Sequence, residues 1–176
     1  SVLKDNPPDL VLSGVNAGVN IGGDIGFSGT VGAAMTAHGL GIPAMSMSQA
    51  WKGDRSSIPW HTSREWLPKV VATLVAAEDW PWHFVPNINV PATEPDEVTG
   101  IEVTQQGHSA VIIPTVEKRQ DLRNQDYFWI YMHKENDNPQ PEEDIAALRR
   151  GAVSVTPMGT NITDAGGGEI LKRVFG

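Results

Sequence analysis

The sequence predicts an α/β protein with parallel strands in its core, and three features support this fold class. An apolar run at residues 9–13 is followed by a helical stretch of small residues at 30–38 and by a second apolar run at 43–48. Nearly continuous apolar strands are typical of a sheet that is covered on both faces. A strand, a helix and a strand in this order predict a right-handed βαβ crossover. We expect a single domain over residues 1–176.

A longer helix and another strand are predicted downstream. Thr62 and Glu65 have the spacing of a capping box, so a helix should begin there and continue to about residue 79. Pro68 either kinks this helix or marks the start of its regular part. Residues 84–90 have the composition of a strand, and the prolines in and beside them favour the edge of a sheet or the end of a strand.

A protruding β-hairpin is predicted within residues 105–140. Residues 110–117 and 127–133 are strand-like, and the polar segment 118–126 separates them. This loop is longer than the tight two-residue kind. A separate short strand is expected before the hairpin, at residues 100–104.

The last part of the chain returns to alternating helix and strand. Pro141, followed by acidic residues in a first helical turn, suits the helix dipole, and this helix should end near Gly151. Residues 152–156 are predicted to form a strand. The glycine-rich tail at 164–168 is expected to be mobile before a short final segment.

The composition excludes several classes of function. The net charge of −8 argues against a long nucleic acid as partner. The lack of cysteine excludes thiol catalysis and Cys-ligated zinc, and the five scattered histidines lack the spacing of a His-rich metal site. No membrane-length apolar run or secretory signal is visible, so a cytoplasmic location without membrane contact is expected. A small phosphorylated ligand remains compatible with this composition.

The segment at residues 13–32 is the most informative for chemistry. It is dense in glycine and asparagine, and it connects the carboxyl end of a predicted strand to a helix, where open α/β sheets bind ligands. It matches neither the P-loop nor the dinucleotide-binding pattern. The competing interpretation is a tight surface loop without a ligand.

Five residues of this segment are candidates for a phosphate and metal site. Ser28, Gly29 and Thr30 stand at the start of the predicted helix, where free N–H groups, the helix dipole and two hydroxyls can hold a phosphate. Asn16 and Asn20 offer neutral oxygen atoms that suit a hard divalent cation and can polarise a phosphoryl group. From the residues alone, a simple helix cap and turn-forming asparagines remain open as alternatives.

These candidates belong to a longer pattern. The runs at residues 8–22 and 28–35 resemble the signature of the SurE nucleotidase family. The likeness continues in order through three further blocks and reaches residue 157, so it spans nearly the whole chain; the blocks are 41–44, 87–91 and 144–149, followed by 153–157. About residues 50–85 and 105–140, only the layout matches.

The resemblance implies a three-layer α/β/α, Rossmann-like core and the metal-dependent hydrolysis of nucleoside monophosphates. This is the activity of a 5′/3′-nucleotidase, an acid-phosphatase-like phosphomonoesterase that needs Mg²⁺ or Mn²⁺. By the same resemblance, Asn16 is a metal ligand and Asn20 is a catalytic residue that contacts the phosphate. Ser28, Gly29 and Thr30 match the phosphate-binding turn for a nucleoside monophosphate or another small phosphomonoester.

The resemblance also implies a homodimer or homotetramer. Members of the family exchange an extended hairpin and their C-terminal elements. In this chain, those elements correspond to the hairpin within residues 105–140 and to the arm after Thr156.

One part of the family pattern does not occur in this sequence. Members begin with a strand that ends in two adjacent aspartates, and no Asp-Asp pair is present here. Because carboxylates supply most of the affinity for a divalent ion, we expect the cation to be held poorly and hydrolysis to be impaired. We also expect one sheet edge and one face to be exposed. The alternative is a truncated or degenerate, non-catalytic oligomeric module that binds nucleotides.

The tryptophans allow a further interpretation. Trp51 and Trp60 flank a loop near the proposed site and could cover a substrate base, whereas Trp66 and Trp129 are expected to pack in the core or an interface. A carbohydrate-binding domain built on these rings is a third and weaker alternative.

Overall fold

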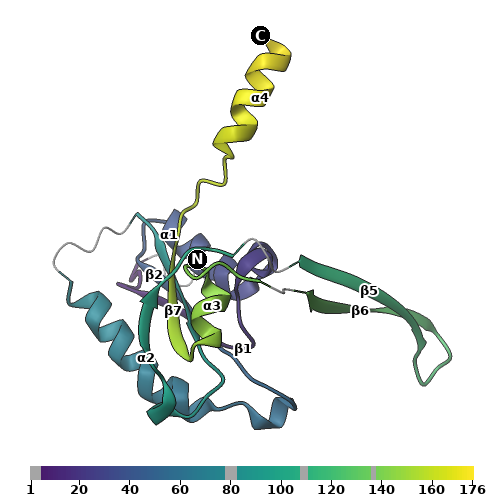
Figure 1. The fold of residues 1–176 in the computed structure, drawn as a ribbon, viewed down its shortest axis with the longest axis horizontal. Coiled ribbons are helices and arrows are strands. Elements are labelled where there is room, and N and C mark those ends of the chain that lie inside the picture. Colours follow the sequence, from purple (N-terminus) through teal and green to yellow (C-terminus); the bar gives the residue numbers. More distant parts are fainter. Residues whose placement is uncertain (1–4, 78–82, 108–110, 136–137) are drawn as a thin grey trace.

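The computed structural model describes residues 5–77, 83–107, 111–135 and 138–176 (Figure 1). Among these residues, a five-stranded sheet has the order β1-β2-β3-β7-β4. Its strands are β1 Val11–Ala17, β2 Ala44–Gln49, β3 Val85–Val90, β7 Ala152–Met158 and β4 Gly100–Val103. Neighbouring strands are parallel except for β3 and β7, which are antiparallel.

Two helices cover opposite faces of this sheet. Helix α1, Gly29–Gly39, packs Ala34 and Ala37 against a cluster that includes Ala44 of β2. Helix α2, Trp60–Val75, packs Leu67 and Val70 against a second cluster that includes Met45 of β2. Because successive side chains of a strand point to opposite faces, α1 and α2 lie on different sides of the sheet. The core therefore has the predicted three α/β/α layers, and β1, α1 and β2 form the predicted βαβ unit.

The hairpin and the C-terminal helix project from this core, as Figure 1 shows. Strands β5, Val111–Gln120, and β6, Asp126–Glu135, pair only with each other in the described residues, which confirms the predicted hairpin. Ala110, where the sequence placed the first strand residue, lies outside the described residues. The glycine-rich segment 164–168 is the start of a helix: α4 spans Ala165–Phe175, and Asp164 caps it by accepting a hydrogen bond from the Gly167 N–H.

The start of α2 differs from the prediction. The helix begins at Trp60, and Thr62 is fully buried and donates a 2.7 Å hydrogen bond to the carbonyl of Thr93 instead of capping the helix. It ends at Val75, earlier than expected, with Pro68 inside it. The short helix α3 spans Asp144–Arg149, so the predicted start at Pro141 was wrong by one turn.

The position of β3 also differs from the prediction in part. It is a central strand, not an edge strand, and all its residues are buried. Pro86 is tolerated because it lies near the strand end and faces Pro157 of β7, so neither residue needs an N–H for this pairing.

The predicted exposed edge is present at β1. Among the strands of the described residues, β1 has β2 as its neighbour on one side only, and Leu12 and Val15 are 45% and 38% exposed. Beside them lies an apolar groove of ≈ 540 Å³, which Met47 and Trp60 also line. In the part of the chain that the structure describes, no helix is both long and apolar enough to cross a bilayer.

Candidate active site

The sheet face that α1 covers is apolar at Ala44 and Val85 and becomes polar further along its central strands. Ser46 and Ser48 of β2 lie beside Asn87 and Asn89 of β3, and all four are fully buried. The Ser46 hydroxyl donates a 2.9 Å hydrogen bond to Asn87 Oδ1. Buried polar groups require partners because each unpaired one loses its hydration without compensation. The segment after β1 provides such partners.

Asn20 provides hydrogen-bond partners for these buried polar side chains. Its N–H donates to Asn89 Oδ1 at 2.8 Å, and its carbonyl accepts from Asn87 Nδ2 at 2.8 Å and from Asn89 Nδ2 at 3.0 Å. Its side-chain Nδ2 donates to the Ser48 hydroxyl at 2.6 Å. Asn20 is only 5% exposed. The atom that would donate to a phosphate is thus directed into the sheet, and Asn20 anchors the loop over the polar face.

Asn16 lies near the end of β1, beside Ser48 of β2 in register. It is half-buried, and its Nδ2 donates a 3.0 Å hydrogen bond to the carbonyl of Gly18. Since this bond uses the amide nitrogen, Oδ1 is the atom of Asn16 that suits a cation.

The N-terminus of α1 combines a helix cap with open space. Ser28 is the N-cap, and its hydroxyl accepts a 3.1 Å hydrogen bond from the Val31 N–H. Gly29 and Thr30 occupy the first turn, where N–H groups have no acceptor within the helix. Apart from its chain neighbours and the backbone of its own helix, a Cβ built on Gly29 would meet no atom within 4 Å, so an anion has room to approach this backbone.

A buried carboxylate fastens the loop that joins Asn20 to Ser28. Asp144 Oδ2 accepts a 2.8 Å hydrogen bond from the Gly22 N–H, and its Oδ1 accepts from the N–H groups of Gly107 and Ile145 at 3.2 and 2.8 Å. Burial raises the pKa of Asp144, although the three N–H donors act in the opposite direction.

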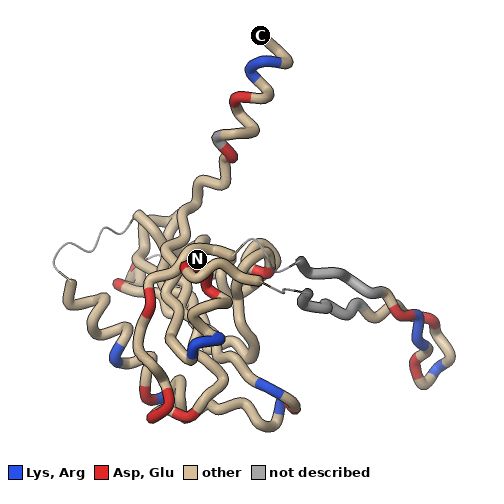
Figure 2. The backbone as a smooth tube through the Cα atoms, viewed as in Figure 1, with Lys and Arg blue, Asp and Glu red and all other residues tan. Residues whose placement is uncertain are grey.

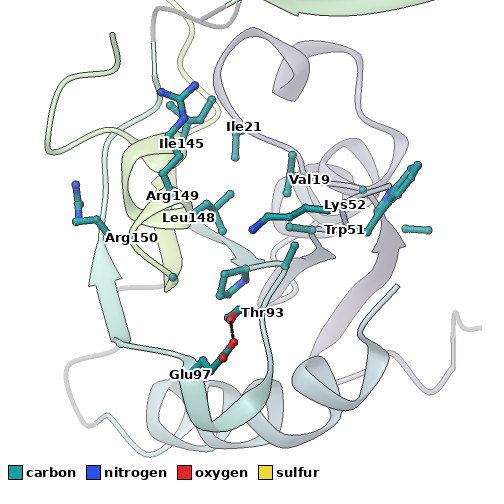
Figure 3. Close-up of a pocket in the computed structure, with 16 residues that line it drawn as sticks. Val19, Ile21, Trp51, Lys52, Thr93, Glu97, Ile145, Leu148, Arg149 and Arg150 are labelled. Carbon is teal, nitrogen blue, oxygen red and sulfur yellow. Dashed lines mark hydrogen bonds between the residues drawn. The ribbon is translucent and has the colours of Figure 1, made fainter. Parts of the chain in front are cut away.

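A cavity of ≈ 800 Å³ opens at the carboxyl ends of β1, β2 and β3 (Figure 3). Ala17 to Val19, Trp51 and Lys52 line one side, and α3 residues line the other. Thr93 donates a 2.7 Å hydrogen bond to Glu97 at its floor, and this bond is the main reason that the pKa of Glu97 is lowered. The cavity borders the segment between Asn16 and Asn20, but neither asparagine lines it.

The tryptophans divide between several surfaces. Trp51 lines the cavity, whereas Trp60 lines the apolar groove at the β1 edge. Trp66 packs against the α2-side core and donates a 3.0 Å hydrogen bond to the carbonyl of Pro95, as expected for a packing residue. Trp129 is 48% exposed on the hairpin.

The described residues contain no group of three or more histidine, aspartate or glutamate side chains that could hold a metal ion. By itself, Asn16 offers a single neutral oxygen atom as a ligand. The donor set of the described chain therefore does not fit a tightly bound divalent cation.

Sequence reasoning missed Asp144, Asn87 and Asn89 as residues that shape the site. The sequence places Asp144 in a first helical turn and in the block 144–149 of the family resemblance, but it assigns this residue no role at the site. Asn87 and Asn89 alternate with apolar residues in β3, and this period of two was a usable signal of a polar face.

Comparisons with known proteins agree with this architecture. The family described as "Survival protein SurE" matches residues 1–112. The "5′-nucleotidase SurE" of Parvibaculum lavamentivorans is 39% identical over 176 residues, which cover 99% of this chain and 63% of the relative. That of Hyphomonas neptunium is 41% identical over 162 residues, which cover 92% of this chain and 64% of the relative.

A solved structure gives the same result for the fold. The crystal structure of the SurE protein from Aquifex aeolicus has a TM-score of 0.76 and 32% identity, and the match covers 98% of this chain and 68% of that one. The chain spans a little under two thirds of the length of the two curated relatives named above. Since the family match covers more than half of the sequence and the three-layer fold agrees, this chain belongs to the SurE family.

Proposed function

We propose that this chain binds the phosphate of a nucleoside monophosphate and contributes that binding site to a 5′/3′-nucleotidase. The observation that carries the proposal is the open N-terminal turn of α1, which follows the loop from β1. The names of the relatives support a phosphomonoester hydrolase. Ser28, Gly29 and Thr30 would hold the phosphate through first-turn N–H groups and hydroxyls, aided by the helix dipole.

Asn16 is the proposed metal ligand, through Oδ1. Mg²⁺ or Mn²⁺, when bound, would polarise the phosphoryl group and activate water. The carboxylates needed to hold such a cation are not gathered among the described residues. We therefore expect the 176-residue chain to bind a nucleotide but to release little phosphate.

Asn20 is proposed to act on the phosphate, and its geometry suggests how. Its Nδ2 now donates to Ser48, so contact with a phosphate requires this side chain to rotate away from β2. Its main-chain bonds to Asn87 and Asn89 would keep the backbone in place during that rotation.

The cavity beside this segment is the proposed place for the nucleoside. Its volume of ≈ 800 Å³ lies within the range of small-molecule sites. Trp51 offers an aromatic face for a base, and Lys52 provides a cation in a protein whose net charge is −8. Placing the nucleoside here does not require the arrangement of polar residues that a carbohydrate-binding site would need.

The projecting elements are proposed to mediate a homodimer or homotetramer. Two ion pairs, Lys118–Asp126 and Arg119–Glu117, lie near the hairpin tip, and Figure 2 shows both signs of charge interspersed there. Apolar side chains of the hairpin are exposed as well, with Phe128 at 66% exposure. Apolar residues of α4 are exposed as well, namely Ile170, Leu171, Val174 and Phe175. Surfaces of this kind are typical of interfaces.

A titration of the chain with AMP tests the binding proposal. We expect AMP to shift the backbone amide resonances of Gly29 to Val31, and Ser28→Ala with Thr30→Val to weaken binding by roughly tenfold through lost donors and a lost cap. Thr36→Val, in the same helix but exposed and bonded only to the Gly32 carbonyl, is the matched control. AMP shifts confined to other elements would contradict the proposal.

A phosphate-release assay separates the enzyme from the alternative. The sequence has no Asp-Asp pair, and the described residues have no carboxylate cluster, which favours a non-catalytic nucleotide-binding module for this chain alone. The same 176 residues preceded by a strand ending in Asp-Asp should hydrolyse AMP with Mn²⁺. Absence of hydrolysis in that longer form, with AMP binding intact, would leave the module as the function.

A further inference from the structure

Asp144 is a fully buried acid that the proposed phosphate and metal contacts do not use. Its exposure is 0%, and its two oxygens accept three backbone hydrogen bonds. One donor, Gly22, is 122 residues away in the sequence. An ion of this kind is costly to bury unless its acceptor sites are satisfied, so the arrangement has a strict geometry.

The carboxylate joins two segments that are otherwise separate. Gly22 lies two residues after Asn20, in the loop that ends at Ser28. Gly107 lies after β4, where the chain leaves the sheet toward the hairpin. Gln106 adds a second link, because its Nε2 donates a 2.8 Å hydrogen bond to the carbonyl of Gly22. Asp144 therefore holds the N–H of Gly22, and Gln106 holds its C=O.

The backbone around Asp144 is arranged to receive it. Its own N–H donates a 2.9 Å hydrogen bond to the carbonyl of Gln105, and the Gln105 N–H donates to the carbonyl of Glu142 at 2.9 Å. A Cβ added to Gly107 would lie 2.9 Å from Asp144 Oδ1, so glycine permits this close approach. The side chain is enclosed and has no exposed atom for a substrate.

We propose that Asp144 is a positioning residue, which holds Gly22 against the base of the hairpin and thereby sets the loop between Asn20 and Ser28. This inference rests on the proposed function, because that loop leads from one proposed phosphate contact to the other. Asp144 acts through Gly22 and does not contact the ligand.

Asp144→Asn is the first test, with the exposed Glu142→Gln as a control that removes the same charge two residues away. An asparagine keeps the shape but places an NH₂ group against a backbone donor. We expect hydrogen exchange at Gly22 and Gly107 to accelerate and the amide shifts of Asn20 to Ser28 to change. AMP affinity should fall by roughly tenfold or more, the size typical of groups that orient a ligand-binding residue.

Gln106→Ala is the second variant, because Gln106 is exposed and its loss leaves the core intact. It removes one neutral hydrogen bond to Gly22, so AMP affinity should fall by about two- to fivefold. Asp144→Glu should not restore the wild-type shifts, since a longer side chain cannot fit between Gly107 and Gly22.

The outcomes separate this proposal from the proposed function. If the wild-type chain does not bind AMP, the proposed phosphate site is wrong. Hydrogen exchange at Gly22 and Gly107 then still tests whether Asp144 positions the loop. If the amides of Asn20 to Ser28 in Asp144→Asn and Gln106→Ala match those of Glu142→Gln, the positioning role is overturned. A loss of AMP affinity with unchanged loop amides would overturn it as well.

Discussion

The two faces of the sheet differ in chemistry although the same strands form both. Below α2, Met45, Met47 and Ile88 belong to one apolar cluster. On the α1 side, beyond an apolar cluster that includes Ala44, the same strands carry serine and asparagine, and the loop through Asn20 satisfies these polar residues. The apolar face can be stabilised by burial alone, whereas the polar face is stable only with one particular loop conformation. We infer that the first provides most of the stability and the second defines the site.

The largest effect should come from the apolar face. Ile88→Ala removes a fully buried side chain from the α2-side cluster, and we expect the free energy of unfolding to fall by about 2–5 kcal/mol. Urea denaturation measures this loss. Under conditions where the variant is folded, its AMP affinity should equal that of the wild type; a weakened affinity would mean that the two faces are not separable.

Asn89→Ala tests the polar face at the adjacent position. It removes two hydrogen bonds to the main chain of Asn20, and the free energy of unfolding should fall by about 1–3 kcal/mol. Unlike Ile88→Ala, it should also weaken AMP binding, because the loop loses its anchor. Calorimetric titration and urea denaturation of both variants provide the comparison. Equal AMP affinities in the two would contradict the division between the faces.

Trp51→Ala tests whether the cavity beside the polar face holds the nucleoside. We expect AMP affinity to fall by roughly tenfold, as for the loss of a ring on which a base stacks, with inorganic phosphate binding unchanged. Trp60→Ala is the control, since Trp60 lines the groove at the β1 edge instead. If the two variants bind AMP equally well, the cavity is not the nucleoside site.

The smallest effect is expected outside both faces, at the Glu102–Arg150 ion pair. The hydrogen bond from Arg150 lowers the pKa of Glu102 below its ordinary value of 4.5. The stabilisation is therefore present above the pKa of the unfolded state and is lost as the pH falls through the lower, folded-state value. Glu102→Gln should be slightly less stable than the wild type at pH 7, and thermal melts of the two should converge as the pH falls through the folded-state pKa of Glu102. A difference in stability between Glu102→Gln and the wild type that widens as the pH falls would contradict this prediction.

Local patterns were sufficient for much of the fold because they depend on neighbouring residues. The βαβ unit, the hairpin and the strand at 152–156 follow from apolar runs and turn residues, and the structure contains all three. The cap of α1 was also foreseeable, since Ser28 accepts from the Val31 N–H three residues along the chain. The residues alone made Asn16, Asn20, Ser28, Gly29 and Thr30 candidates but left other interpretations open; the three layers and the specific roles of these residues came from the resemblance to the family.

Other features depended on segments that are distant in the sequence. Thr62 resembled a helix cap, but its hydroxyl bonds the carbonyl of Thr93, and Pro86 suggested an edge although Pro157 faces it in a central pair. Asp144 had the pattern of an ordinary first-turn acid until folding brought Gly22 and Gly107 to it. The sequence by itself thus determined which segments form strands and helices, because those preferences are local. Only the tertiary structure decided which polar groups are buried together, because their partners come from loops up to 122 residues apart.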